Sequence, residues 1–218
     1  MMRCFSILLI FLFSLSSFAR EHSVKFKKEL FQILSYSSIR PNEFAFKSNE
    51  LIIKVDNSAS PLIYPLKEAK KYKELLFKAS LKGKVNYQKS QGEKGSDDFS
   101  LRVGVVYEGD KTLNFFQKAI AANWIVTLFE LAPEGTGVSQ INFYNTFQDE
   151  KLRDRKREHP LSDLLIENFV ADISKSDSVD VKVPLNQNKK ILALWISSDG
   201  DDTSSKYEVK LSKIILKD

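Results

Sequence analysis

Several short segments of the chain alternate apolar and polar residues at the period of a β-strand. In the clearest of them, Phe99, Leu101, Val103, Val105 and Tyr107 occupy every second position. Successive side chains of a strand point to opposite faces of a sheet, so this segment is predicted to be a half-buried strand. Segments of this kind must bury their apolar faces against another layer, which restricts the fold to a few layered β architectures.

Other segments extend this pattern. Residues 75–82 and 141–147 also alternate, whereas residues 124–131 and 191–196 have apolar residues on both faces and are predicted to be central strands covered on two sides. Turn sequences rich in Gly, Pro and Asp separate the runs. The short strand spacing, without regularly interspersed helices, favours a mainly β fold: an antiparallel, jelly-roll-like β-sandwich with one or two short helices.

The last predicted strand contains a change of phase. Its apolar residues are odd-numbered up to Leu211 and even-numbered from Ile214 onwards. One extra residue in the strand produces such a shift, so a β-bulge is predicted near residues 212–213.

Four other segments are less clear. Residues 26–34 have apolar residues at helical spacing, and residues 65–73 are rich in helix formers and could make one short turn of helix. Residues 165–173 fit a helix as well as a strand. Residues 149–159 are nearly all charged, with both signs mixed, which predicts a solvated loop or exposed helical turn rather than a functional site.

The first 19 residues have the organisation of a secretory signal. Arg3 precedes an apolar stretch at residues 5–18, and small residues at Ser17 and Ala19 favour cleavage after Ala19. The apolar stretch is shorter than the ~20 residues that a membrane-spanning helix needs. We therefore predict a signal peptide at residues 1–19, a single β-sandwich domain at residues 20–218 without a transmembrane segment, and export to the periplasm or extracellular space.

The residues available exclude several chemistries. Cys4 is the only cysteine and lies within the predicted signal, so the exported part has no disulfide and no thiolate, as fits a bacterial envelope protein. His22, expected at a frayed terminus, and His159 are too few for a histidine-based zinc site, and His159 could act in a catalytic triad only from an ordered loop. The net charge of +5 is spread among many acids, so nucleic acid is not an expected partner.

Two clusters of aspartates lie at the ends of predicted strands. One opens the strand at residues 99–107 and the other follows the strand at residues 191–196; their members are Asp97 and Asp98, and Asp199, Asp201 and Asp202. Three interpretations are open: turn residues, an oxygen cage for Ca²⁺, and a catalytic pair across a cleft. The ligand or calcium interpretation requires that the two clusters meet at one end of the sandwich.

Arg102 and the aromatic residues complete the set of candidates. Arg102 shares a strand face with Asp98 and would either pair with an aspartate of a neighbouring strand or face solvent. Trp124 could form part of an aromatic platform for sugars, although strand aromatics are more often core residues, Trp195 above all. The residues predicted to bind a ligand are Asp97, Asp98, Arg102, Trp124, Asp199 and Asp201, and those predicted to bind Ca²⁺ are Asp199, Asp201 and Asp202.

At the two clusters, the chain resembles an exported bacterial family of unknown function. That family pairs a Gly-Asp-Asp-Phe strand start, followed by Arg-Val, with a later Thr-Asp-x-Asp-Asn-Thr segment; here the equivalents are SDDFSLRV at residues 96–103 and ISSDGDDT at residues 196–203. Ser96 replaces the family's Gly and Asp202 its Asn. The resemblance implies export and a jelly-roll-like sandwich similar to carbohydrate-binding modules, and it implies no activity.

Three functions agree with these features. The first is a non-catalytic module that binds a glycan or another envelope component. The second is a carboxylate-dependent glycan hydrolase, which would need a protonated acid beside an ionised partner. The third is a structural envelope domain that binds protein through an exposed apolar patch.

Overall fold

The computed structural model describes residues 21–159 and 162–218, and the export signal predicted at residues 1–19 lies outside them. The described chain is mainly β, with two short α-helices. The α-helices are α1 (Phe115–Ile120) and α2 (Asn123–Phe129). The strands are β1 (Glu21–Ser23), β2 (Gln32–Ile33), β3 (Glu43–Lys47), β4 (Glu50–Asp56), β5 (Leu62–Lys70), β6 (Glu74–Lys82), β7 (Arg102–Gly109), β8 (Gly137–Phe147), β9 (Lys156–His159), β10 (Ser162–Asp172), β11 (Ser178–Pro184), β12 (Ile191–Ser197) and β13 (Lys206–Lys217).

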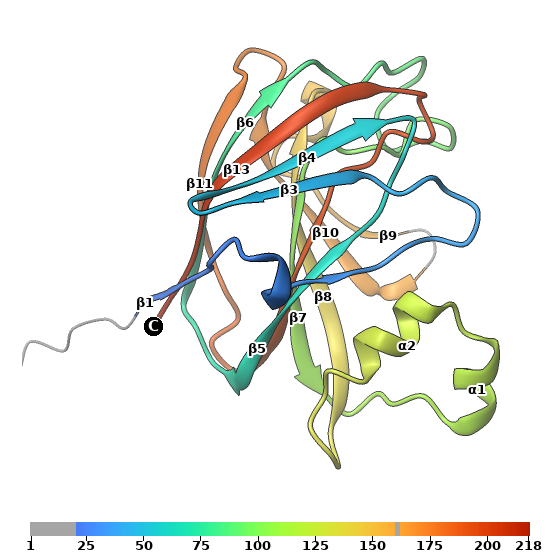
Figure 1. Ribbon diagram of the computed structural model, residues 1–218, viewed down its shortest axis with the longest axis vertical. Helices are drawn as coiled ribbons and strands as arrows, with labels where there is room; N and C mark the ends of the chain where they lie inside the picture. Colours follow the sequence, from blue (N-terminus) through green and yellow to red (C-terminus); the bar gives the residue numbers. More distant parts are fainter. Residues whose placement is uncertain (1–20, 160–161) are drawn as a thin grey trace, which may run out of the picture.

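The strands form two sheets that pack as a sandwich (Figure 1). Sheet A has the order β11-β6-β13-β4-β3, with β1 also paired to β13. Sheet B has the order β2-β5-β12-β7-β8-β10-β9. The predicted β-sandwich with short helices is therefore confirmed. The strand pairs are antiparallel, as predicted, with the exception of β8 and β10, which run parallel.

The main core lies between the two sheets. Sheet A contributes the alternating residues of β6, such as Phe77, and sheet B contributes those of β7, such as Val103 and Val105. β7 is buried on its other face as well, where Val106 belongs to a second apolar cluster. The prediction of a half-buried strand was therefore wrong for β7, because α2 and neighbouring side chains cover the outer face of sheet B.

The predicted bulge is confirmed in β13. The register of β13 against β6 shifts between Leu211 and Lys213, so the apolar residues on both sides of the shift point into the core. The one-residue insertion explains the change of parity in the sequence.

Several predicted elements differ from the structure. Residues 123–129 form α2 instead of a central strand, since an apolar run has no period that separates strand from helix. Residues 62–70 form β5 rather than a turn of helix, because pairing with β2 and β12 outweighs local propensity. Within residues 26–34, where helical spacing was noted, only Lys28–Leu30 is helical, as a 3-10 turn.

The first described residues are not frayed, contrary to expectation. β1 pairs with β13, with Glu21 opposite Lys217, and His22 contacts the ring of Tyr64. The two ends of the described chain therefore lie side by side (Figure 1).

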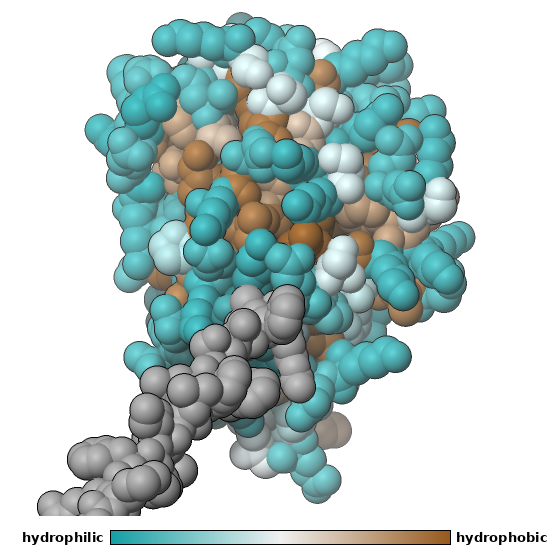
Figure 2. Space-filling view, turned by 90° about the vertical axis from the view of Figure 1, so that its left-hand side faces the viewer, coloured by the Kyte–Doolittle hydropathy of each residue, from teal (hydrophilic) through white to brown (hydrophobic). Residues whose placement is uncertain are grey.

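The surface of the sandwich is mostly hydrophilic. Figure 2 shows polar side chains surrounding a smaller band of apolar ones on the face nearest the N-terminal strand. Across the described ranges, each helix is too short or too polar to cross a membrane.

Candidate functional site

A pocket of about 700 Å³ lies on the outer face of sheet B. Its floor consists of apolar side chains from β8 and β12, among them Ile141, Phe143 and Trp195, and α2 forms one wall with Trp124 and Leu128. Several residues that line the pocket belong to the second apolar cluster. Packing of α2 over the outer face of sheet B therefore both buries that face and encloses the pocket.

Four aromatic residues form a row along the pocket. Trp195 packs edge-to-face with Trp124 and with Phe143, with ring centroids 5.7 and 5.8 Å apart, and Trp124 packs against Tyr36 at 6.2 Å. Trp195 is a core residue, as predicted, and is 4% exposed. Trp124 is only half-buried, so it is the tryptophan that a ligand can reach.

Gly104 of β7 allows Phe143 and Trp195 of this row to pack closely against the strand. A Cβ atom at this position would come within 2.9 Å of both the Phe143 ring and the Cβ of Trp195. The absence of a side chain therefore sets the depth of the pocket floor.

The two aspartate clusters meet at one end of the pocket, as the ligand interpretation requires. Asp98 accepts hydrogen bonds from the backbone N–H of Thr203 at 2.8 Å and from its hydroxyl at 2.5 Å. The backbone N–H of Asp97 donates to Asp202 at 3.3 Å. Turns separated by about a hundred residues of chain are therefore joined directly.

Arg102 connects the clusters to each other. Its Nε donates to Asp199 at 2.7 Å, its Nη2 donates to the carbonyl oxygen of Asp97 at 2.8 Å, and its guanidinium lies 4.2 Å from the centre of the Phe99 ring. The prediction that Arg102 pairs with an aspartate of a neighbouring segment is confirmed, and the alternative of a solvent-facing charge is wrong.

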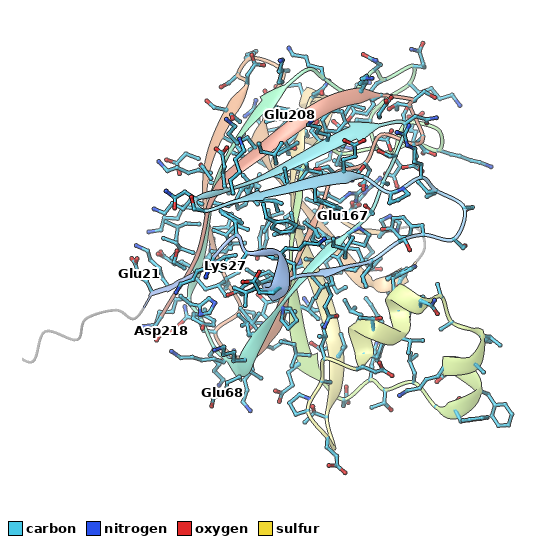
Figure 3. All side chains as sticks on the ribbon, in the orientation of Figure 1. Glu21, Lys27, Glu68, Glu167, Glu208 and Asp218 are labelled. Carbon is cyan, nitrogen blue, oxygen red and sulfur yellow. The ribbon has the colours of Figure 1, made fainter. Side chains whose placement is uncertain are left out.

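Two further residues of this network were missed by sequence reasoning. Glu167 of β10 is 0% exposed and accepts hydrogen bonds from Arg102 at 2.5 Å, from Arg157 at 2.5 Å and from Asn145 at 3.0 Å. Figure 3 shows Glu167 near the middle of the view, whereas Glu68 lies at the lower left edge of the sandwich. Arg157 of β9 also pairs with Asp97 at 2.6 Å.

Residues 149–159 were predicted to be a solvated loop or an exposed helical turn rather than part of a functional site, and the second half of this prediction was wrong. The segment contains a 3-10 turn and β9, and β9 places Arg157 and His159 beside Asp97. All side chains of this short edge strand are charged or polar. The sequence therefore has no apolar alternation from which to predict which of them point inward.

The environment shifts the pKa values of the acidic residues in opposite directions. Burial raises the pKa of Asp199 to about 6, although Arg102 opposes the shift, and the charges of Asp98 and Asp201 add to it. Burial also raises the pKa of Asp98 and Asp201. Burial opposes ionisation of Asp97 too, but the hydrogen bond with His159 and the charges of Arg102 and Arg157 lower its pKa.

All residues predicted to bind a ligand line this pocket. They are Asp97, Asp98, Arg102, Trp124, Asp199 and Asp201, and Asp202 of the predicted calcium set lies there too. Residues 21–159 and 162–218 contain no group of three or more His, Cys, Asp or Glu side chains arranged to hold a metal ion. Calcium binding at this corner stays a prediction.

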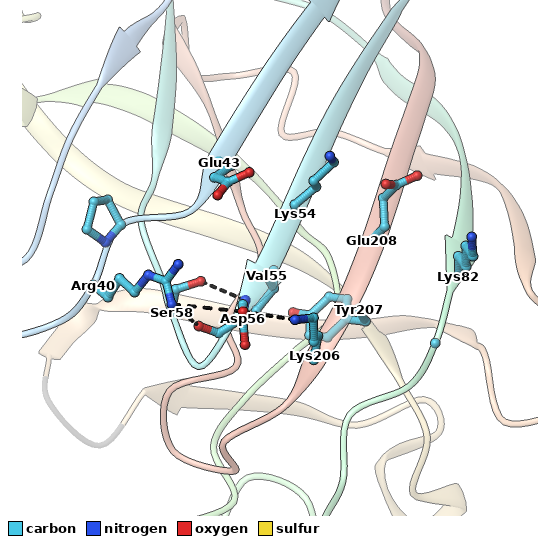
Figure 4. Close-up of a pocket in the computed structure, with 12 residues that line it drawn as sticks. Arg40, Glu43, Lys54, Val55, Asp56, Ser58, Lys82, Lys206, Tyr207 and Glu208 are labelled. Carbon is cyan, nitrogen blue, oxygen red and sulfur yellow. Dashed lines mark hydrogen bonds and ion pairs between the residues drawn. The ribbon is translucent and has the colours of Figure 1, made fainter.

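A second hollow of about 600 Å³ lies over sheet A (Figure 4). Charged residues of both signs surround it, and they pair with one another: Asp56 with Arg40 at 3.9 Å and with Lys206 at 3.1 Å. These side chains are largely exposed, so this hollow is a solvated strand face rather than a comparable binding site.

Comparisons with known proteins give similarity of structure alone. No protein-family model and no curated protein matches the sequence. A family 11 carbohydrate-binding module from Clostridium thermocellum, solved with a β-1,3-1,4-mixed-linked tetrasaccharide, has a TM-score of 0.45 and 8% identity, over 92% of this chain and 96% of that module. A family 29 carbohydrate-binding module from Piromyces equi has a TM-score of 0.34 and 9% identity, over 91% and 90%. A mutant family 29 module solved with mannohexaose has a TM-score of 0.38 and 8% identity, over 91% and 92%.

Proposed function

We propose that this protein is a non-catalytic glycan-binding module that acts in the cell envelope or outside the cell after export. The observation that carries the proposal is the pocket on sheet B, where an aromatic row adjoins a group of carboxylates. A volume of about 700 Å³ lies in the range of small-ligand sites.

The two ends of the pocket suit the two aspects of a sugar. The C–H face of a pyranose ring packs against aromatic rings, which Trp124 offers from α2 above the Trp195 floor. Sugar hydroxyls are hydrogen-bond donors, and Asp199 and Asp201 supply acceptor oxygens at the other end.

The test compares glycan binding by the wild type and by Trp124→Ala. We expect at least one neutral oligosaccharide of a glycan panel to bind, and the substitution to weaken that binding by about tenfold or more because stacking area is lost. Phe116→Ala is the matched control, since Phe116 is 79% exposed on α1 and does not line the pocket. Absence of binding by the wild type, or equal binding by Trp124→Ala, would overturn the proposal.

A second candidate function is a carboxylate-dependent glycan hydrolase, and the raised pKa of Asp199 favours it. A carboxyl group that stays protonated near pH 6 can act as a general acid. The ion pair with Arg102 works against this role, because it stabilises the ionised form. Release of new reducing ends from a bound glycan, abolished in Asp199→Asn, would support hydrolysis, and an intact glycan after prolonged incubation would exclude it.

A further inference from the structure

The acidic end of the pocket contains more negative than positive charge. Six carboxyl groups gather in this end or directly behind it, and the basic side chains beside them are the guanidinium groups of Arg102 and Arg157 and the His159 imidazole, 3.5 Å from Asp97. The carboxyl groups are those of Asp97, Asp98, Glu167, Asp199, Asp201 and Asp202.

The guanidinium groups are already engaged, by Glu167 behind the pocket and by Asp97 and Asp199 in its lining. Glu167 receives both Arg102 and Arg157, and Asp97 receives Arg157. Arg102 is also held against the Phe99 ring and by the Asp97 carbonyl oxygen, so it is fixed in place. It therefore cannot turn to neutralise further charge in the cavity.

Asp199 and Asp201 are left incompletely compensated. Asp199 contacts Arg102 through Oδ2 alone, and Asp201 makes no ion pair within the described part of the chain. Both carboxylates line the cavity together with Asp98 and Asp202, so the crowding of like charges makes their ionisation costly there. A cation placed between them and the aromatic row would lower that cost.

The pocket floor has a second feature that points to a ligand. Trp195 is 4% exposed and lines the pocket, and its indole N–H has no hydrogen-bond acceptor among residues 21–159 and 162–218. Buried donors of this kind are rare in folded proteins. The Trp124 and Tyr36 rings beside it can also stabilise a cation through their faces.

We propose that the pocket prefers a glycan carrying a free amino group, with the ammonium bound by Asp199 and Asp201 and the sugar ring packed on Trp124. This selectivity rests on the proposed glycan-binding function. A neutral hydroxyl can occupy the same position, but it gains no charge–charge attraction. An acetylated amine has lost its charge and is also bulkier.

The experiment uses three β-1,4-linked trisaccharides that differ only at carbon 2: hydroxyl in cellotriose, acetamido in the N-acetylglucosamine trimer and ammonium in the glucosamine trimer. Binding to the full protein is measured by calorimetry at about pH 6.5, where carboxylates are largely ionised, with a chelator present to remove Ca²⁺. We expect the glucosamine trimer to bind about tenfold or more tightly than cellotriose, a ratio that falls with added salt.

The variant Asp201→Asn isolates the charge. It should bring the affinity ratio between the glucosamine trimer and cellotriose close to one, because it removes the charge that attracts the ammonium and keeps an acceptor oxygen for the hydroxyl. Asp177→Asn is the matched control, since Asp177 is exposed and does not line the pocket, and it should leave the ratio unchanged. An equal reduction in both variants would show nonspecific attraction of a cation and would overturn the proposal.

The remaining outcomes separate the two proposals. If the neutral sugars bind as tightly as the glucosamine trimer or more tightly, glycan binding stands and the preference for an amine is wrong. If none of the three trisaccharides binds and the panel of neutral glycans also fails, both proposals fall.

Discussion

Glu167 shows how one buried residue connects distant parts of the pocket. Its carboxylate is fully enclosed and receives two guanidinium groups, from β7 and from β9, as well as the amide of Asn145. Removing one partner from such a network leaves a buried charge uncompensated, which costs far more than the pair itself contributes.

We therefore expect Glu167→Gln to lower the free energy of unfolding by about 3–5 kcal/mol. Chemical denaturation followed by tryptophan fluorescence measures this change. Glu158→Gln is the control, because Glu158 is the exposed residue next to Arg157 on β9 and should cost less than about 0.5 kcal/mol. Similar stability of both variants would contradict a structural role for the Glu167 network.

Asp201 is expected to lower stability at neutral pH. Its pKa is raised by burial and by the charge of Asp98, so its ionisation costs more in the folded state than in the unfolded chain. The penalty appears as pH rises above the ordinary value of about 3.9 and is absent below it.

Asp201→Asn should thus raise the melting temperature at pH 7 by about 1–2 °C, which corresponds to ~0.5 kcal/mol in a domain of this size. At about pH 3, Asp201 is largely protonated and as neutral as the substituted Asn. The difference in melting temperature should therefore vanish. Melting curves over this pH range provide the measurement. A loss of stability at neutral pH would show that Asp201 makes a favourable contact instead.

Some of these residues were identifiable from sequence and others were not. Asp97, Asp98 and Asp199 stand in turns beside recognisable strands, and Arg102 follows the alternation of its own strand, so their convergence was predictable. Glu167 lies in a segment that fitted helix and strand equally, and Arg157 lies among charges of both signs. For these two residues, only tertiary pairing decides which side chain points inward.

At the scale of elements, the helical connection between β7 and β8 is the part least explained by packing. α1 exposes Phe115, Phe116 and Ile120, which are 79–87% exposed, while α2 buries Leu128 against the sheet. Asn114 caps α1, since its side-chain oxygen accepts a hydrogen bond from the backbone N–H of Gln117 at 2.9 Å and its own backbone N–H donates to the Gln117 side chain at 2.9 Å. Local capping rather than burial therefore stabilises α1.

The double change Phe115→Ser and Phe116→Ser should accordingly alter the free energy of unfolding by less than about 0.5 kcal/mol. By contrast, Phe143→Ala should lower it by about 3–5 kcal/mol, since Phe143 is buried in the pocket floor. Urea titration of both variants tests the contrast. A large loss in the double variant would mean that α1 packs against the sandwich more closely than the structure shows.

Elements whose apolar residues recur at a regular spacing were predicted better than elements without such a pattern. The alternation in β6, β8 and β13 marks strands directly, and the parity change in β13 even gives the site of its bulge. α2 has no such mark, because Trp124, Ile125 and Leu128 stand in a run of apolar residues that fits a buried strand equally well. The parallel pairing of β8 with β10 depends on chain routing, which local sequence does not encode.

At the scale of the whole molecule, the pocket depends on the complete fold. Its lining comes from strands β7, β8, β9, β10 and β12, from α2, and from the connections around them, including the segment before β3 and the turn before β13. A ligand that binds this assembly and not the unfolded chain must raise its stability in proportion to occupancy.

Melting temperature therefore tests the calcium prediction as well. If Asp199, Asp201 and Asp202 hold Ca²⁺, addition of about 100 times the dissociation constant should stabilise the fold by ~2.7 kcal/mol, and a chelator should reverse the effect. Asp202→Asn should abolish the response while Asp177→Asn retains it. Equal melting temperatures with calcium and with chelator would show that the calcium prediction is wrong.

The pairing of Glu21 with Lys217 has a practical consequence for attachment. Both ends of the described chain emerge at the same edge of the sandwich, on the side opposite α2 (Figure 1), which forms one wall of the pocket. A carrier protein, a bead or a dye joined through either end would thus leave the cavity facing outward. Protein immobilised through its N-terminal end and protein immobilised through its C-terminal end should then bind the same amount of ligand.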